Sequence, residues 1–235
     1  SKIPLIPLGF LRRGSIFGAN AVGLLQVAPF VGMVFILTYY LQQLRAYSAF
    51  SAGLAFLPMG IVFLVVSVFL SARLVNRLGV KPVIISGMAL QVVGYLSLAP
   101  IYITESYFGG LLGPTLLIGV GTGLSFTAIN IAVLTGLRKG EEGLASGLIN
   151  TSRQIGGPIG LAVLLTVANF ETPHTAGQIV VQSMVTGFGY AFLAAVLLTG
   201  IGIMFTALFI REKTSSDKSG SGGNHSSELE EALSY

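Results

Sequence analysis

Residues 184–210 read MVTGFGYAFLAAVLLTGIGIMFTALFI and contain no charged side chain. A helix that crosses a membrane needs about 20 mostly apolar residues, so this stretch is predicted to be a transmembrane helix. Four earlier runs are also free of charge, and a further one, Gly143–Phe170, is interrupted only by Arg153. We therefore predict an all-α membrane bundle of six spans, near residues 16–41, 51–74, 82–101, 108–136, 143–168 and 184–210.

The composition agrees with a protein whose surface faces lipid. Of the 235 residues, 53% are hydrophobic and 9% are charged, whereas soluble domains carry about 25% charged residues. The chain has no Cys, which excludes disulfides and thiolate metal sites. It has no basic patch with interleaved aromatic residues, so no nucleic-acid partner is expected. Membrane lipid is the expected partner of this surface, and neither a cofactor nor a metal ion is expected.

The basic residues indicate the orientation of the helices, because Lys and Arg accumulate in cytoplasmic loops. When six spans alternate in direction, 11 of the 13 Lys and Arg residues fall on the side of the termini. Arg45 falls on the opposite side, and Arg153 lies inside a span. Both termini of the segment are therefore expected to be cytoplasmic. The expected organisation is a cytoplasmic lead-in at 1–15, a six-helix bundle at 16–210 and a disordered, Ser/Gly-rich cytoplasmic tail at 211–235.

The span at 143–168 carries a stripe of polar and small side chains at helical steps of three and four residues. Its members are Gly143, Ser146, Gly147, Asn150, Arg153, Gln154 and Gly157, with Leu144, Leu148, Ile155, Ile159 and Ala162 on the opposite face. Such a stripe either faces a water-filled cavity or forms a packing seam between helices. Arg153 favours the cavity, because a packing seam does not need a buried charge.

Arg153 is placed deep in its span. It follows Glu142 by about 16 Å along a helix, close to the middle of a hydrocarbon layer about 30 Å thick. A charge there costs between about 2.5 and more than 10 kcal/mol, Arg does not lose its proton, and the spans contain no Asp or Glu. Either Arg153 faces a central cavity, where it meets water and an anionic group, or it caps carbonyl groups of a neighbouring broken helix.

Glycines, amides and prolines mark other positions in the spans. Gly119 and Gly123 are assigned to close helix packing, as are Gly156, Gly157 and Gly160. A dinucleotide-binding loop at 119–123 is excluded, because no soluble strand precedes it. Gln26 and Gln91 are isolated amides of the kind that most often hydrogen-bond to a neighbouring helix. Kinks are expected where proline lies inside a span, at Pro29, Pro58 and Pro158.

Four segments resemble the major facilitator superfamily of transporters. The loop Ala72–Pro82 resembles the signature between the second and third helices of that family; Leu74, Arg77, Gly79 and Lys81 match, whereas Ala72 and Asn76 replace a Gly and an Asp. The helix Gly143–Ala162 closely resembles the penultimate helix of the fourteen-span drug:proton antiporters in the superfamily. Residues 4–20 resemble the cytoplasmic lead-in to the ninth span of these antiporters, and residues 52–60 resemble their tenth span. The likeness covers residues 4 to about 210.

This resemblance implies the C-terminal half of a fourteen-span secondary transporter, with the N-terminal half as an absent partner. It also implies proton-coupled export of drugs or other amphipathic small molecules by alternating access, so protons and a small-molecule substrate are expected partners. The implied substrate pathway includes Gln26 and Asn130, with Asn150, Arg153 and Gln154 of the polar stripe as further candidates. The implied cytoplasmic gating loop includes Asn76, Arg77, Gly79 and Lys81. Because the spans lack acidic residues, the proton-carrying group would lie in the absent half, or coupling would use another group.

Two other classes of function are less well supported. A membrane enzyme needs paired acids, metal ligands or an activated nucleophile, and the spans contain no Asp, Glu, His or Cys. Glu171 and His174 lie together in an outer loop without a third ligand. A non-transporting membrane scaffold or receptor subunit is the alternative to a transporter, and a flux assay on the full-length protein separates the two.

Overall fold

The regular elements of the protein are helices throughout the described residues. The structure is a computed structural model that describes residues 14–100, 107–135, 137, 140–170 and 178–210. Strands are absent from these residues, as expected for an all-α protein. The predicted lead-in and tail fall almost entirely on residues 1–13 and 211–235, and Glu171 and His174 fall on 171–177; these ranges lie outside the described residues.

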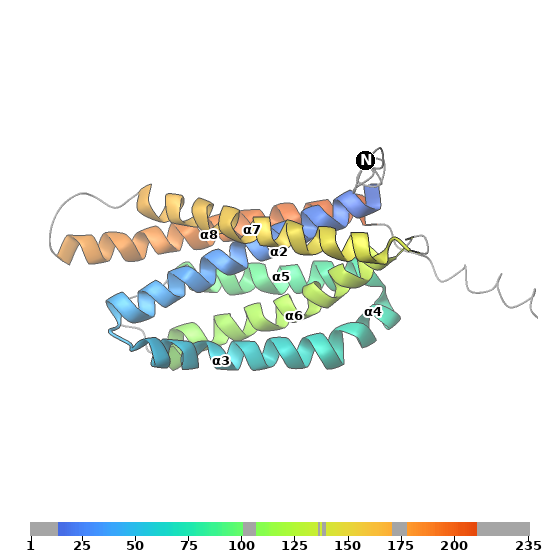
Figure 1. Cartoon of the computed structure of the whole chain (residues 1–235). Coiled ribbons are helices and arrows are strands. Elements are labelled where there is room, and N and C mark those ends of the chain that lie inside the picture. Colours follow the sequence, from blue (N-terminus) through green and yellow to red (C-terminus); the bar gives the residue numbers. More distant parts are fainter. Residues whose placement is uncertain (1–13, 101–106, 136, 138–139, 171–177, 211–235) are drawn as a thin grey trace, which may run out of the picture.

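The helices follow the predicted spans closely (Figure 1). The first is α2 (Gly14–Tyr39), which continues through a π-helical turn, η1 (Tyr40–Leu44). The second run joins α3 (Ala49–Val65), the π-helical turn η2 (Val66–Ser71) and α4 (Ala72–Leu78) without a break. It is followed by α5 (Val80–Leu98), η3 (Tyr107–Leu111) with α6 (Leu112–Leu134), α7 (Glu142–Phe170) and α8 (Gln178–Phe209). The largest difference in a boundary is at α8, which begins at Gln178 and not near residue 184.

Within the described residues, five helical runs are long and apolar enough to cross a membrane. They are Ile16–Leu44, Ala49–Leu78, Val80–Leu98, Tyr107–Leu134 and Ser183–Phe209. The helix α7 has sufficient length, with 29 residues, but Arg153 and its polar neighbours lower its hydropathy below that of the others. That α7 is a sixth span therefore stays a prediction.

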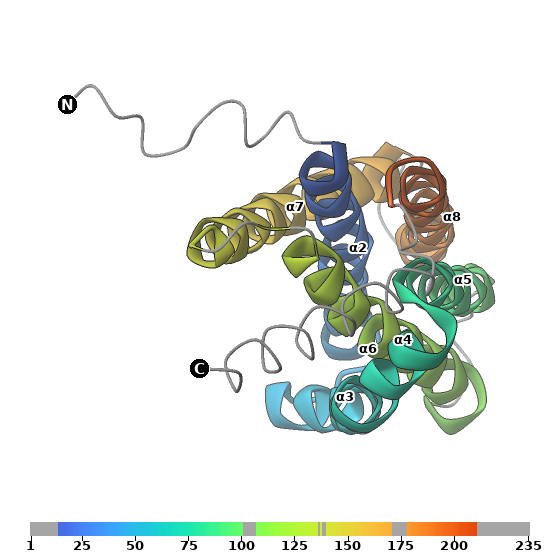
Figure 2. The ribbon, with the colours of Figure 1, turned by 90° about the vertical axis from the view of Figure 1, so that its right-hand side faces the viewer.

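The helices α2 and α6 occupy the middle of the bundle. α2 packs against α7, α8 and α6, whereas α6 packs against α5 and α3. Figure 2, viewed along the helices, shows α7 and α3 on either side of this central pair, with α5 and α8 together at the remaining side. The run formed by α3, η2 and α4 is the least buried of the five apolar runs. The arrangement leaves α3 and α7 at the margins, each resting mainly on one central helix.

The core consists of two apolar clusters at the two ends of the bundle, with polar side chains between them. One cluster includes Met33, Leu37, Tyr95, Ile118 and Phe192, and the other includes Val22, Ile84, Met88, Ile129 and Ile149. On five of the helices a buried polar residue lies between members of the two clusters: Gln26 on α2, Gln91 on α5, Thr122 on α6, Arg153 on α7 and Thr199 on α8. The middle of the bundle is therefore more polar than either end.

Glycines lie where helices cross most closely. A Cβ atom added to Gly119 or Gly123 of α6 would lie 2.9 Å from the carbonyl oxygen of Met59 or Phe63 on α3. On α7, a Cβ on Gly156 would lie 2.8 Å from the carbonyl oxygen of Leu24. A Cβ on Gly160 would overlap the backbone of Ala28, and one on Gly157 would lie 3.3 Å from the side chain of Val31. The five glycines assigned to packing thus lie at contacts of α6 with α3 and of α7 with α2.

Candidate functional site

Arg153 reaches from α7 across to α6. Its side chain is 8% exposed, and Nη1 donates a hydrogen bond of 3.0 Å to Oδ1 of Asn130. Nη2 donates to the carbonyl oxygen of Phe126 at 3.4 Å, and the guanidinium carbon lies 4.1 Å from the centre of the Phe126 ring. A Cβ added to Gly23 would lie 3.8 Å from Nε, so α2 forms the back of the site. The predicted residues Asn130 and Arg153 are therefore brought together where α2, α6 and α7 meet.

Asn130 is held in the orientation that receives this bond. Its Nδ2 donates to the carbonyl oxygen of Phe126, one turn earlier on α6, at 3.0 Å, which leaves Oδ1 directed to the arginine. Phe126 was not singled out from the sequence, although it lies four residues before Asn130 and therefore on the same helix face. The site thus combines a cation with a ring face, a carbonyl oxygen and an amide oxygen.

Among the described residues, the groups that contact Arg153 are electron-rich but carry no negative charge. Guanidinium has five N–H donors, and two of them bond to acceptors on α6. Nε is buried and has no hydrogen-bond partner among the described residues. The acidic residues nearest along α7 are Glu141 and Glu142 at its beginning. The site can therefore receive further acceptors, and an anionic one would also balance the charge.

The structure divides the polar stripe of α7 between two surroundings. Asn150 and Gln154 are exposed, as are Gly143, Ser146 and Gly147, whereas Arg153 and Gly157 are buried. The reason is the close crossing with α2 at Gly156 and Gly160, which places the side of α7 that runs from Arg153 to Gly160 against α2. Ile155 and Ile159, expected on the opposite face, are exposed as well. Asn150 and Gln154 thus lie beside the Arg153 site on the outer face of α7 and are not inside it.

A second link between α7 and α2 was also missed from the sequence. Ser152 Oγ donates to Oδ1 of Asn20 at 3.0 Å, and Nδ2 of Asn20 donates to the carbonyl oxygen of Ile16 at 2.8 Å. Asn20 is 8% exposed. The amide thus orients one end of the α2–α7 contact, and only the three-dimensional structure brings it to Ser152.

The isolated amides Gln26 and Gln91 are both buried. Gln26 is 1% exposed, and its Oε1 has no hydrogen-bond partner among the described residues. Gln91 donates from Nε2 to Ser125 Oγ at 3.0 Å, which joins α5 to α6, while its Oε1 is also without a partner there. Gln91 therefore takes part in the interhelical bond expected of a structural amide. Gln26 lies one turn after Gly23 and has an unused acceptor in the polar middle of the bundle.

The residues of the predicted gating loop lie at the end of the bundle where α4 meets α5. Asn76 and Arg77 are exposed on the last turn of α4. Gly79 has φ 93°, a left-handed conformation that favours glycine. Lys81 Nζ donates to the carbonyl oxygen of Ala207 on α8 at 2.7 Å. The loop is thus tied to the C-terminal end of α8, where a cation also interacts favourably with the helix dipole.

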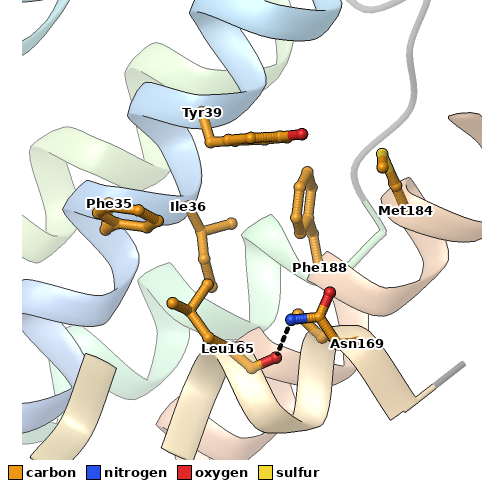
Figure 3. A pocket seen from close by; sticks show the side chains of 8 residues that line it. Phe35, Ile36, Tyr39, Leu165, Asn169, Met184 and Phe188 are labelled. Atoms are coloured by element: carbon orange, nitrogen blue, oxygen red, sulfur yellow. Dashed lines mark hydrogen bonds between the residues drawn. The ribbon is translucent and has the colours of Figure 1, made fainter. Parts of the chain in front are cut away.

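A hollow lies at the other end of the bundle, between α2, α7 and α8 (Figure 3). It has a volume of about 190 Å³ and is lined by Phe35, Ile36, Tyr39, Leu165, Ala168, Asn169, Met184 and Phe188. The rings of Tyr39 and Phe188 meet edge to face, with centres 6.0 Å apart, and Nδ2 of Asn169 donates to the carbonyl oxygen of Leu165 at 2.8 Å. Its lining suits an apolar ring or chain. No sequence motif indicated it, because its residues come from three separate helices.

Comparison with known proteins identifies the family. Residues 1–161 match the Major Facilitator Superfamily, and the chain belongs to this superfamily of multi-pass membrane proteins. It is 34% identical over 206 residues to the Cephamycin export protein CmcT of Amycolatopsis lactamdurans, covering 87% of this chain and 41% of the relative. It is 32% identical over 212 residues to the Puromycin resistance protein pur8 of Streptomyces alboniger, covering 84% and 42%.

A third relative has similar identity and coverage. The Lincomycin resistance protein of Streptomyces lincolnensis is 30% identical over 208 residues, covering 88% of this chain and 40% of the relative. The chain thus spans about two fifths of the length of the curated relatives it matches. The resemblance to the superfamily that its sequence motifs carry is confirmed.

Proposed function

We propose that the chain forms the C-terminal six-helix half of a fourteen-span drug exporter in the cell membrane. The observation that carries this proposal is the likeness to a protein named for cephamycin export, which extends over 87% of the chain. Relatives named for puromycin and lincomycin resistance support export of drugs or other amphipathic small molecules. The exporter works by alternating access and exchanges its substrate for protons.

The helix α7 is the sixth span in this proposal. Its length of 29 residues exceeds the roughly 20 residues that a span requires, and its polar residues are explained by contact with protein or water. The N-terminal half covers α7 and α3, because these marginal helices have exposed surfaces and each packs mainly on one central helix. The substrate pathway then passes the Arg153 site, and both termini of the segment are cytoplasmic.

Efflux from cells tests the proposed function directly. The full-length protein that contains this chain is expressed in a drug-sensitive bacterium, and accumulation of puromycin, lincomycin and a cephamycin is measured with and without a protonophore. We expect lower accumulation of at least one of these drugs and loss of this difference when the proton gradient is dissipated. Accumulation equal to that of the empty-vector strain for all three would favour a non-transporting scaffold, and efflux that survives the protonophore would exclude proton coupling.

Expression in two parts tests whether the chain is half of a transporter. Residues 1–235 alone are expected to insert into the membrane without reducing drug accumulation, because alternating access moves one bundle against the other. Coexpression with the remaining N-terminal part is expected to restore efflux. Efflux by residues 1–235 alone, as a purified and reconstituted monomer, would contradict the proposal.

A further inference from the structure

Arg153 keeps an unbalanced positive charge inside the bundle. Its guanidinium contacts the ring and carbonyl oxygen of Phe126 and the amide oxygen of Asn130, which are all neutral. The spans predicted from the sequence contain no Asp or Glu, and the nearest acid on α7 is Glu142 at its first position. A ring face and neutral acceptors stabilise a cation only in part. Its surroundings therefore favour a further, anionic acceptor.

The unused donors of Arg153 determine the chemistry of that acceptor. Two N–H groups bond to α6, so three remain, including the buried Nε–H. Arg presents its N–H groups as a planar fork that matches the two oxygens of a carboxylate. Such a fork binds carboxylates and phosphates, and of the two the carboxylate shares its planar shape.

The residues that contact the guanidinium along the seam between α6 and α7 are less buried than Arg153 itself. Asn130 and Phe126 are only half-buried. The helix α6 packs much more extensively on α5 and α3 than on α7. Asn150 and Gln154 are exposed on the adjoining face of α7, where their amide N–H groups can also donate to an anion. In the proposed transporter, the absent half covers α3 and α7, so the seam between α6 and α7 lies next to the covered surface.

We propose that Arg153, supported by Asn130, is the binding group for a carboxylate of the transported molecule. This inference rests on the proposed export function, and it specifies that the site selects substrates with an ionised carboxyl group. The same carboxylate chemistry could come from an acidic side chain of the other half, and the experiments below distinguish the two sources.

Binding is measured on the purified full-length protein in detergent. Its melting temperature is followed during titration with sodium benzoate, and with benzamide as the neutral control of nearly equal shape, at constant ionic strength. We expect stabilisation by benzoate and not by benzamide. Arg153→Gln should weaken the apparent affinity for benzoate by about tenfold or more, Arg153→Lys should retain part of it, and Arg73→Gln, which removes an exposed charge on α4, should not change it.

A second variant keeps the test valid if Arg153→Gln fails to accumulate. Asn130→Asp preserves the shape of the side chain and places a carboxylate about where Oδ1 accepts from Nη1, at 3.0 Å in the native protein. The variant exchanges the Nδ2 bond to the carbonyl oxygen of Phe126 for a charge-assisted bond to the guanidinium. It should lose the response to benzoate, because the internal carboxylate occupies the guanidinium. An undiminished response in Asn130→Asp or Arg153→Gln, or no response in the wild type, would overturn the proposal.

Transport separates the two sources of the carboxylate. Proteoliposomes that contain the full-length protein are assayed for export of a cephamycin and of its methyl ester, which lacks the charge. We expect Arg153→Gln to lower export of the cephamycin at least about tenfold while the ester is exported as by the wild type. Equal loss of both substrates would assign the carboxylate to the protein and overturn the substrate inference. Absence of export of any probe by the wild type would refute the proposed function, and the benzoate titration would still decide whether the site binds a carboxylate.

Discussion

The crossing of α7 over α2 at Gly160 predicts a strong effect from a single added methyl group. A Cβ at this position would overlap three backbone atoms of Ala28, its carbonyl oxygen, carbonyl carbon and Cα. Backbone atoms cannot rotate away as a side chain can, so Gly160→Ala forces the two helices apart. The neighbouring contact of Gly156 with Leu24, where a Cβ would lie 2.8 Å from the carbonyl oxygen, would open with it.

The expected loss of stability follows from two opposing effects. Overpacking of a close contact costs about 1–3 kcal/mol, and the obstructing backbone places Gly160→Ala at the upper end of this range. Replacement of Gly by Ala inside a helix contributes about 1 kcal/mol in the other direction. The net expectation is a decrease of about 2 kcal/mol in the free energy of unfolding.

Reversible unfolding of the purified full-length protein in SDS measures this difference. Gly200→Ala on α8 is the matched control, because Gly200 is exposed in the middle of a helix and a Cβ there would have no neighbour within 4 Å. The control should be as stable as the wild type or up to about 1 kcal/mol more stable. If Gly160→Ala is as stable as Gly200→Ala, the close crossing of α7 and α2 is wrong.

Three further predictions concern topology and polar contacts. An impermeant thiol reagent applied from outside the cell should label Arg45→Cys and spare Leu78→Cys; the reverse pattern would contradict the orientation. Lys81→Met removes the bond to the carbonyl oxygen of Ala207 and should lower the free energy of unfolding by about 0.5–1 kcal/mol. Lys81→Arg should preserve most of this stability. Equal stability of Lys81→Met and the wild type would show that the bond contributes nothing. Gln91→Met removes a buried oxygen that has no partner among the described residues, together with one interhelical bond. The free energy of unfolding should therefore change by less than about 1 kcal/mol, and export should be unaffected. Loss of export would assign Gln91 to the pathway.

The helices were predictable because the length of an apolar run is a direct consequence of membrane thickness. Hydropathy marks where lipid contact begins and not where backbone hydrogen bonding begins, so α8 extends back to Gln178 beyond its predicted start. The partners of each helix could not be read from one sequence. Glycines indicated that close crossings exist, but only the structure pairs Gly119 with Met59 and Gly160 with Ala28.

The candidate site was predictable in its components and not in its geometry. Arg153 was identifiable because a mid-span charge is rare, and Asn130 because its helix resembles a central span of the family. Their hydrogen bond depends on the position of α7 relative to α6, and the contribution of Phe126 depends on a ring that is indistinguishable in sequence from one that faces lipid. The exposure of Asn150 and Gln154 follows from the tilt of α7 on α2, which periodicity alone does not define.

The π-helical turn η2 makes the number of residues in the second span as important as their identity. Such a turn contains one residue more than the α-helical turn it replaces, and it is fixed on α6 by hydrogen bonds of Ser67 with Thr127 at 2.6 Å and of Ser71 with the carbonyl oxygen of Leu124 at 2.9 Å. Deletion of a single codon between Val66 and Ser71 would let the turn revert to α-helix and keep the direction of α4 relative to α3, whereas deletion of one codon from the regular part of α3 would rotate α4 by about 100° relative to the residues before the deletion. Arg73 and Arg77 would leave the bundle in a different direction only after the deletion in α3, although neither deletion changes a side chain of the loop. Alignments of this region should accordingly be examined for one-residue gaps before substitutions in the loop are interpreted.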